Sequence, residues 1–134
     1  MDVFNQSDRS AVMRSVKSKN TGAEMKVRRL LHAAGFRYFL HVKNLPGKPD
    51  IVFPRRKKAV FVHGCFWHQH GECRSAHRPA SNSDYWNAKL DRNMARDERN
   101  LANLKELGWE TFVVWECAIR DQNTLLETLK SFLG

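Results

Sequence analysis

The sequence predicts an α/β fold in which helices flank a mixed β-sheet. Two segments with helix start signals come first, three short β-rich runs follow at close spacing, and a long helical segment separates these runs from a fourth one. Closely spaced β-rich runs favour a meander, whereas a strand that returns after a long helix favours a mixed sheet. We therefore expect the element order α-α-β-β-β-α-β-α.

The first third of the chain is predicted to be mostly helical. Ser7 can cap a short helix that runs to about Lys17. The sequence T-G-A-E from Thr21 to Glu24 is a capping box, which opens an amphipathic helix that Gly35 closes.

Three β-rich runs then predict a meander. They are separated by turn segments rich in proline, glycine and basic residues, and they occupy residues 36–42, 50–53 and 59–63. A long, charge-rich helix follows, which begins at Ser83 or Asp84 and ends at Gly108.

The last predicted elements are a buried strand over residues 109–116 and a helix capped by Asp121. The expected core residues of this strand are Trp109, Phe112, Val114 and Trp115.

Length and charge narrow the class of protein. The 134 residues suit a single domain that spans the whole chain, residues 1–134. Residues 1–58 hold 14 Lys and Arg against 4 Asp and Glu, whereas residues 59–134 hold 9 against 10. Such a basic half favours a polyanionic partner, and nucleic acid is the best candidate because no long apolar helix suggests a membrane. A basic surface without a partner is the alternative.

A cluster of metal-ligand residues follows the third predicted strand. Cys65, His70 and Cys73 form a C-x4-H-x2-C set, and Cys117 is the one further cysteine. Together these four can form a closed zinc centre, and mixed Cys and His ligands without a redox motif favour zinc over iron. Three cysteines cannot all pair in disulfides, so we expect reduced thiols in a cytoplasmic protein. Small buried side chains with solvated histidines are the alternative, and the possible competing ligands are His68 and His77.

Asp50 stands at the start of the second predicted strand, directly after the turn of residues 45–49. Its carboxylate would project at the end of the sheet. Together with phosphate oxygens and a neighbouring backbone carbonyl, such a carboxylate can hold magnesium for phosphodiester hydrolysis. An aspartate that only ends a turn is the alternative.

Four motifs in this order resemble those of the very-short-patch repair endonucleases. They are L-P-G-K-P-D at residues 45–50, F-V-H-G-C-F-W-H at 61–68, D-Y-W at 84–86 and L-G-W-E-T-F-V-V-W-E-C-A at 107–118, and the resemblance runs from about Arg9 to Leu125. It implies a restriction-endonuclease-like fold with a structural zinc. It also implies a magnesium-dependent nick 5′ to the thymine of a T:G mismatch in double-stranded DNA. Such a nick would begin the repair of deaminated 5-methylcytosine, with mismatch-repair proteins as further partners.

The same resemblance implies roles for four active-site residues. Asp50 would be the central magnesium ligand, and His68 the base or proton-transfer group near the attacking water. His63 would contact the scissile phosphate, and Glu24 would polarise His68 or hold a metal-bound water. Because a zinc-bound imidazole could not act as a base, we place His68 outside the zinc shell. A purely capping Glu24 and a purely structural, buried His63 stay open as alternatives.

The chain departs from the family pattern at three points. Val62 replaces a threonine; a backbone carbonyl ligand to magnesium tolerates this change, whereas a required hydroxyl does not. The loop between Cys65 and Cys73 is one residue longer, so the assignment of His70 to zinc rests on its distance from Cys65. The second acidic residue and the lysine of restriction-type nucleases are not evident on the third strand, which favours a histidine-assisted mechanism.

The resemblance further implies contacts with the duplex. Aromatic side chains would wedge between base pairs at the mismatch, where unstacking costs least, although burial in the core is the alternative. Independently of the resemblance, the basic residues on and near the first predicted helix suggest that residues 1–20 form a helical clamp on the DNA. The expected DNA-contacting residues are Phe66, Trp67, Trp86, Arg14, Lys17, Lys48 and Asn93.

We therefore expect a monomeric, nucleoid-associated nuclease that nicks one strand. The first alternative is a restriction-type endonuclease that cuts matched sites. The second is a zinc-containing module that binds DNA without cutting it.

Overall fold

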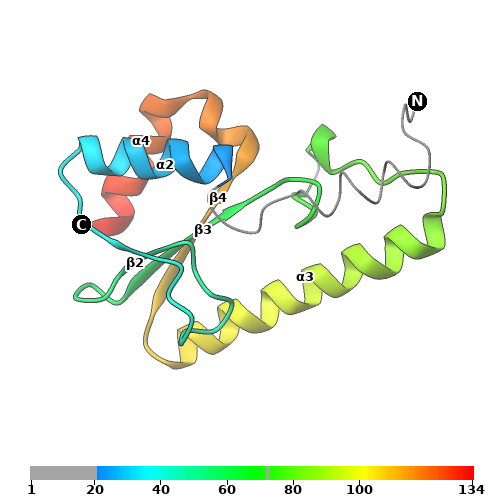
Figure 1. Ribbon diagram of the computed structural model, residues 1–134, viewed down its shortest axis with the longest axis horizontal. Helices are drawn as coiled ribbons and strands as arrows, with labels where there is room; N and C mark the ends of the chain where they lie inside the picture. Colours follow the sequence, from blue (N-terminus) through cyan, green and yellow to red (C-terminus); the bar gives the residue numbers. More distant parts are fainter. Residues whose placement is uncertain (1–20, 72) are drawn as a thin grey trace.

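Four strands form one mixed sheet at the centre of the computed structural model, which describes residues 21–71 and 73–134 (Figure 1). The strands β1 (Phe39–Leu40), β2 (Ile51–Phe53) and β3 (Lys58–His63) pair as antiparallel neighbours, and β4 (Glu110–Trp115) pairs in parallel with β3. The predicted meander and mixed sheet are therefore confirmed. β1 is shorter than predicted because the chain turns at His41, whose φ is +48°.

Three α-helices surround the sheet within the described residues. They are α2 (Gly22–Ala33), α3 (Ser83–Glu106) and α4 (Gln122–Leu133), and two short 3₁₀-helices add η1 (Arg74–Ala76) and η2 (Glu116–Arg120). The helix predicted from Ser7 to Lys17 lies outside the described residues, as does the whole segment 1–20.

The helix boundaries follow the start and stop signals of the sequence. Thr21 Oγ1 accepts a 3.1 Å hydrogen bond from the backbone N–H of Glu24, which is the first half of the predicted capping box. Asp121 caps α4 in the same way, by accepting from Thr124 N–H at 3.1 Å. Gly108 ends α3 with a φ of +87°, a conformation that glycine adopts at no steric cost.

Different helices cover the two faces of the sheet. The main core lies between the strands and the pair α2 and α4, which lie together on one side in Figure 1; it contains Val27, Leu31, Ile51, Phe53, Val60, Val114, Ile119, Leu125, Leu129 and Leu133. Successive strand residues point to opposite faces, so Ala59, Phe61 and His63 of β3 point away from this core. α3 runs along that second side (Figure 1).

This alternation places the polar residues. Val62 packs on the main core, whereas His63, the next residue, lies on the side of α3. Of the residues predicted for the core on and beside β4, Val114 is buried, and Phe112, Trp115 and the preceding Trp109 are half-buried. Among the described residues, no helix is both long and apolar enough to cross a membrane.

Candidate active site and metal centre

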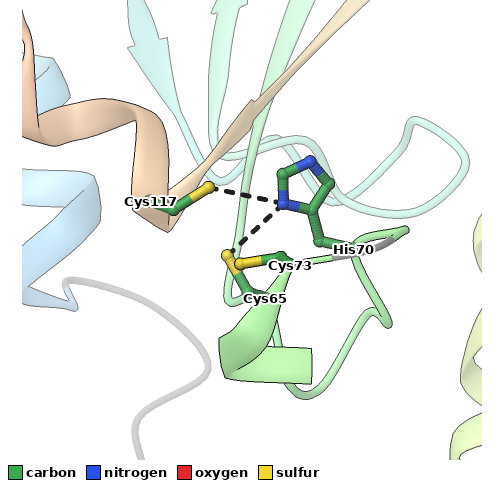
Figure 2. Close-up of side chains that lie close together, drawn as sticks. All are labelled: Cys65, His70, Cys73 and Cys117. Carbon is green, nitrogen blue, oxygen red and sulfur yellow. Dashed lines mark hydrogen bonds between the residues drawn. The ribbon is translucent and has the colours of Figure 1, made fainter. Parts of the chain in front are cut away.

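Four side chains with metal-binding atoms converge beyond the ends of β3 and β4 (Figure 2). Cys65 follows β3, and Cys117 lies in η2 directly after β4. His70 and Cys73 come from the loop that continues from Cys65 to η1. Their ligand atoms all lie within 4.8 Å of one another. His70 Nδ1 is 3.4 Å from Cys117 Sγ and 3.7 Å from Cys65 Sγ. Two ligands of a tetrahedral zinc are separated by about 3.5–3.8 Å, so the donor set fits zinc.

The surroundings of this cluster are also those of a metal centre. Burial raises the pKa of Cys65 to about 11, although a hydrogen bond from the backbone of Cys117 opposes this shift, and a bound cation would stabilise the thiolate. The His70 ring is stacked on Trp115, with ring centroids 4.2 Å apart, which fixes the direction of Nδ1. The two competing histidines are not in the cluster, because His77 is exposed and His68 faces another partner.

A second cluster joins Asp50 to Glu24 and His41, and their ligand atoms also lie within 4.8 Å of one another. The backbone N–H of Val62 donates a 2.7 Å hydrogen bond to Asp50 Oδ2. Glu24 is 2% exposed although it belongs to the first turn of α2, and its Oε2 is 2.8 Å from His41 Nε2. The Glu24 carboxylate thus points into the molecule, toward Asp50.

The electrostatics of this cluster favour a bound cation. Burial raises the pKa of Asp50 to about 6; the Val62 N–H opposes this shift, and the negative charge of Glu24 adds to it. A divalent cation would relieve both the burial cost and the repulsion between two carboxylates. Carboxylate oxygens are the ligands that magnesium prefers, so the donor set fits this ion.

A third cluster contains His63, His68 and Asp97. His68 Nδ1 lies 2.6 Å from Asp97 Oδ2, and the two histidine rings are stacked with centroids 3.8 Å apart. Burial and the neighbouring His68 lower the pKa of His63 to about 4, so His63 is neutral near pH 7. Burial alone would raise the pKa of Asp97. The hydrogen bond and the charge interaction with His68 outweigh burial, so the pKa of Asp97 is lowered.

β3 holds the second and third clusters together. Val62 binds Asp50 through its backbone, and the adjacent His63 stacks on His68. The four residues predicted for catalysis therefore lie in two groups that share one strand end. Glu24 belongs with Asp50, so the expectation that it polarises His68 is corrected: the Nδ1 atom of His68 is bound by Asp97.

Sequence reasoning missed two residues of these clusters, Asp97 and His41. Asp97 lies in the charge-rich sequence of the long helix, but it shares the helical stripe of Trp86, Leu90 and Asn93, and this spacing is the signal that could have found it. His41 lies opposite Asp50, because its N–H donates to the Asp50 carbonyl at 3.2 Å just beyond the β1–β2 register.

The aromatic residues form a cluster of their own. Phe66 and Trp67 are half-buried, with ring centroids 5.1 Å apart, and both rings contact Trp86 of α3. Trp86 is 3% exposed because these rings cover it. The expectation that Trp86 offers an open surface to DNA is thus corrected for this structure, in which Trp86 supports the other two rings.

The predicted polar DNA contacts have different positions. Lys48 is exposed two residues before Asp50. Asn93 donates a 3.1 Å hydrogen bond to the Trp67 carbonyl, so its amide group is engaged within the protein. Arg14 and Lys17 lie outside the described residues.

Comparison with known proteins identifies the family. Residues 1–75 match the family of the DNA mismatch endonuclease Vsr. This chain belongs to the Vsr family. A type II nicking enzyme of Xanthomonas oryzae pv. oryzae is 50% identical over 125 residues, which cover 93% of this chain and 91% of that enzyme. A type II nicking enzyme of Neisseria meningitidis serogroup A is 43% identical over 128 residues, with coverage of 96% and 91%.

The Vsr relationship extends to the protein that carries the family name. The DNA mismatch endonuclease Vsr of Escherichia coli is 36% identical over 126 residues, which cover 94% of this chain and 80% of the relative. The predicted resemblance to the very-short-patch repair endonucleases is therefore confirmed, and a Vsr-family chain is a DNA endonuclease. Membership in the family also makes DNA the partner of this chain.

Proposed function

We propose that this Vsr-family endonuclease nicks one strand of double-stranded DNA 5′ to the thymine of a T:G mismatch. Such a nick would begin very-short-patch repair of deaminated 5-methylcytosine. The observation that carries the proposal is the meeting of the Asp50 and His68 clusters at the end of β3, beside an aromatic pair. One group can hold a metal, the next can take a proton, and the third can probe base stacking.

His68 is the group that takes the proton of the attacking water. Its Nδ1 is bound to the Asp97 carboxylate, so Nδ1 is the protonated nitrogen and the lone pair lies on Nε2. Water that loses a proton to Nε2 attacks phosphorus, and the bond from phosphorus to one sugar oxygen breaks. That oxygen leaves as an alkoxide and takes up a proton. Asp97 acts here as a positioning residue, because it fixes the tautomer of His68.

Asp50 and the backbone carbonyl of Val62 would hold Mg²⁺. A strand residue directs its N–H and C=O to the same edge, so the bond from Val62 N–H to Asp50 supports a carbonyl on the Asp50 side. A backbone ligand is also compatible with valine at this position. When bound, magnesium supplies charge neutralisation at the scissile phosphate and lowers the pKa of bound water. Glu24 is placed to orient a water of this site.

His63 would contact the scissile phosphate as a neutral donor. Its pKa of about 4 leaves it uncharged near pH 7, because burial and the stacked His68 disfavour its charged form. Phe66 and Trp67 would enter the duplex at the mismatch, supported by Trp86. Lys48 would meet a phosphate near Asp50.

The cysteine cluster would hold a structural Zn²⁺. The four mixed ligands close the coordination shell, which leaves no open position for a reacting water. We further propose that the protein acts as a monomer in the cytoplasm, since one active site suffices for one nick and the thiols must stay reduced. Recruitment of mismatch-repair proteins belongs to the same proposal.

The experiment that tests this function is strand-resolved cleavage of a T:G duplex and its matched T:A counterpart with magnesium. The native chain is compared with Asp50→Ala. We expect a nick on the thymine strand of the T:G duplex alone, lost in the variant. Cutting of both duplexes would instead indicate a site-specific nuclease, and binding without cutting would indicate a zinc-containing binding module.

A further inference from the structure

The loop that carries the aromatic pair, residues 64–70, has its backbone carbonyls held one after another. Gly64 O accepts from His68 N–H at 3.1 Å and Cys65 O from His70 N–H at 3.0 Å. Side chains bind the next two carbonyls: Gln69 Nε2 donates to Phe66 O at 2.7 Å, and Asn93 Nδ2 donates to Trp67 O at 3.1 Å. The backbone of Phe66 is thus fixed by a side chain of the same loop, and the backbone of Trp67 is fixed by a side chain of α3.

Gln69 is the centre of this arrangement. Its Nε2 donates both to Phe66 O and to Ala76 O, the latter at 3.1 Å, and its Oε1 accepts from Arg78 Nε at 2.8 Å. Arg78 fixes the orientation of the Gln69 amide, because the guanidinium group only donates hydrogen bonds and so must face the amide oxygen. The amide nitrogen then points to the two backbone carbonyls. Gln69 has a φ of +51°, a conformation that needs such support in a residue other than glycine.

Arg78 connects this amide to α3. Its Nη1 donates to Asn87 Oδ1 at 3.0 Å, and its Nη2 donates to Asp91 Oδ1 at 2.8 Å. Asn87 and Asp91 are one helical turn apart, so the planar guanidinium spans the helix surface while its Nε faces Gln69. Lysine could bind one of these groups but could not bind all three in this fixed geometry.

The chain Arg78–Gln69–Phe66 therefore connects the surface of α3 to the backbone of the aromatic pair. The helix also supports the two rings from below through the buried Trp86. A loop that is ordered before binding loses less conformational entropy when its side chains enter a duplex. Inserting side chains can distinguish weak stacking at a mismatch from normal stacking only if they keep their position against the base pairs.

We infer that Arg78 is a positioning residue for mismatch recognition, which acts through Gln69 to hold Phe66 and Trp67 ready for insertion into DNA. This inference rests on the proposed function. It assigns the specificity for a mismatch to groups that do not themselves touch the reacting atoms. His68 has its own anchor in Asp97, so the rate of the nick should depend little on Arg78.

The test uses Arg78→Met, Arg78→Lys and Gln69→Met, which keep the size of each side chain. The matched control is Arg74→Met, since Arg74 is an exposed arginine with no ion pair among the described residues. Binding to T:G and T:A duplexes is measured without magnesium, and 2-aminopurine beside the mismatch reports unstacking by its fluorescence. The nicking rate is measured separately with magnesium at saturating enzyme.

We expect Arg78→Met and Gln69→Met to weaken binding to the T:G duplex about tenfold more than to the T:A duplex, the size of one lost charge-assisted hydrogen bond. The 2-aminopurine signal should fall in parallel, and Arg78→Lys should be intermediate. The nicking rate at saturation should stay within about threefold of the native rate. Arg74→Met should weaken both duplexes equally.

The inference is overturned if Arg78→Met weakens both duplexes equally, as a lost phosphate contact would. It is also overturned if the saturated rate falls while the binding ratio is unchanged, because the network would then position His68. Gln69→Met leaves the bonds between Arg78 and α3 in place, so it decides the matter if Arg78→Met does not fold. A native protein that does not distinguish the two duplexes would refute the proposed function itself.

Discussion

At the scale of single residues, chemistry here depends on pairs in which one member fixes the state of the other. An isolated imidazole divides its proton between two nitrogens, but the 2.6 Å contact with Asp97 assigns it to Nδ1 of His68. The bond from Val62 N–H similarly orients one oxygen of Asp50. Both partners come from parts of the chain distant in sequence, so each role depends on the fold.

The role of Asp97 predicts a rate effect without a binding effect. In Asp97→Asn the amide group can donate to Nδ1 and so favour the wrong tautomer of His68. We expect the single-turnover nicking rate to fall about 10²- to 10⁴-fold, with little change in DNA affinity. The matched control is Glu98→Gln, which changes the same charge on an exposed position of α3. A variant Asp97→Asn that keeps its rate would remove Asp97 from the mechanism.

The raised pKa of Asp50 predicts how magnesium binding depends on pH. Below pH 6 the carboxyl group is protonated, and the metal must displace that proton. The apparent affinity for magnesium should therefore fall about tenfold for each pH unit below about 6, and it should be constant above about 7. Magnesium-dependent thermal stabilisation between pH 5 and pH 8 measures this, independently of cleavage. Asp50→Asn should show no such stabilisation at any pH.

The same pKa has an effect on stability without metal. The folded protein binds the Asp50 proton more tightly than the unfolded chain, whose ordinary pKa is 3.8. The stabilisation from this proton is complete below pH 4 and is lost as the pH rises through 6. Metal-free Asp50→Asn should thus become more stable than the native protein above pH 6, by roughly 3 kcal/mol. Urea unfolding at pH 4 and pH 8 gives the comparison; a constant difference would contradict it.

At the scale of elements, the sequence predicted most boundaries because the signals are local. Thr21 and Asp121 cap their helices because their side-chain oxygens accept hydrogen bonds from the first turn. Gly108 ends α3 because glycine adopts a positive φ without steric cost. Asp97, the partner of His68, was harder to find, because a carboxylate on a helix surface looks solvated until a distant loop packs on it. His41 was harder to find because its place opposite Asp50 follows only from the pairing of β1 with β2. The four members of the cysteine cluster could be found from the sequence, because few other residues have the same metal-binding chemistry.

The proposed zinc centre would connect the loop after β3 to η2 after β4. Cys117→Ser should lower the zinc content from about one ion per chain to well below that value. The melting temperature should fall by more than about 5 °C, because metal binding contributes to folding. Zinc is measured by atomic emission after gel filtration. His77→Ala is the control and should keep its zinc; loss of the ion there would reassign the ligand set.

At the scale of the whole molecule, many of the candidate site residues lie in one segment, residues 62–70. Other elements of the fold supply the residues that bind them. Asp50 precedes β2, Glu24 belongs to α2, Asp97 and Asn93 belong to α3, and Cys117 belongs to η2. In the proposed mechanism, recognition of the mismatch by aromatic side chains and attraction of DNA by positive charge are therefore separate tasks. The surplus charge lies mainly in residues 1–58, which hold 14 Lys and Arg against 4 Asp and Glu.

This separation predicts different responses to salt. Phosphate contacts release counterions, so affinity for any duplex should fall steeply with salt, with a logarithmic slope of about −0.9 per contact. Insertion of Phe66 and Trp67 releases none, so the ratio of T:G to T:A affinity should stay nearly constant between 50 and 200 mM salt, about the range over which phosphate contacts dominate the response. Lys48→Gln should reduce both slopes by about 0.9 and leave the ratio unchanged. Lys130→Gln, on the exposed surface of α4, should alter neither. Fluorescence anisotropy titrations measure the dissociation constants of both duplexes at both salt concentrations for each protein. A ratio of T:G to T:A affinity that falls steeply with salt would mean that charge, and not the aromatic pair, recognises the mismatch.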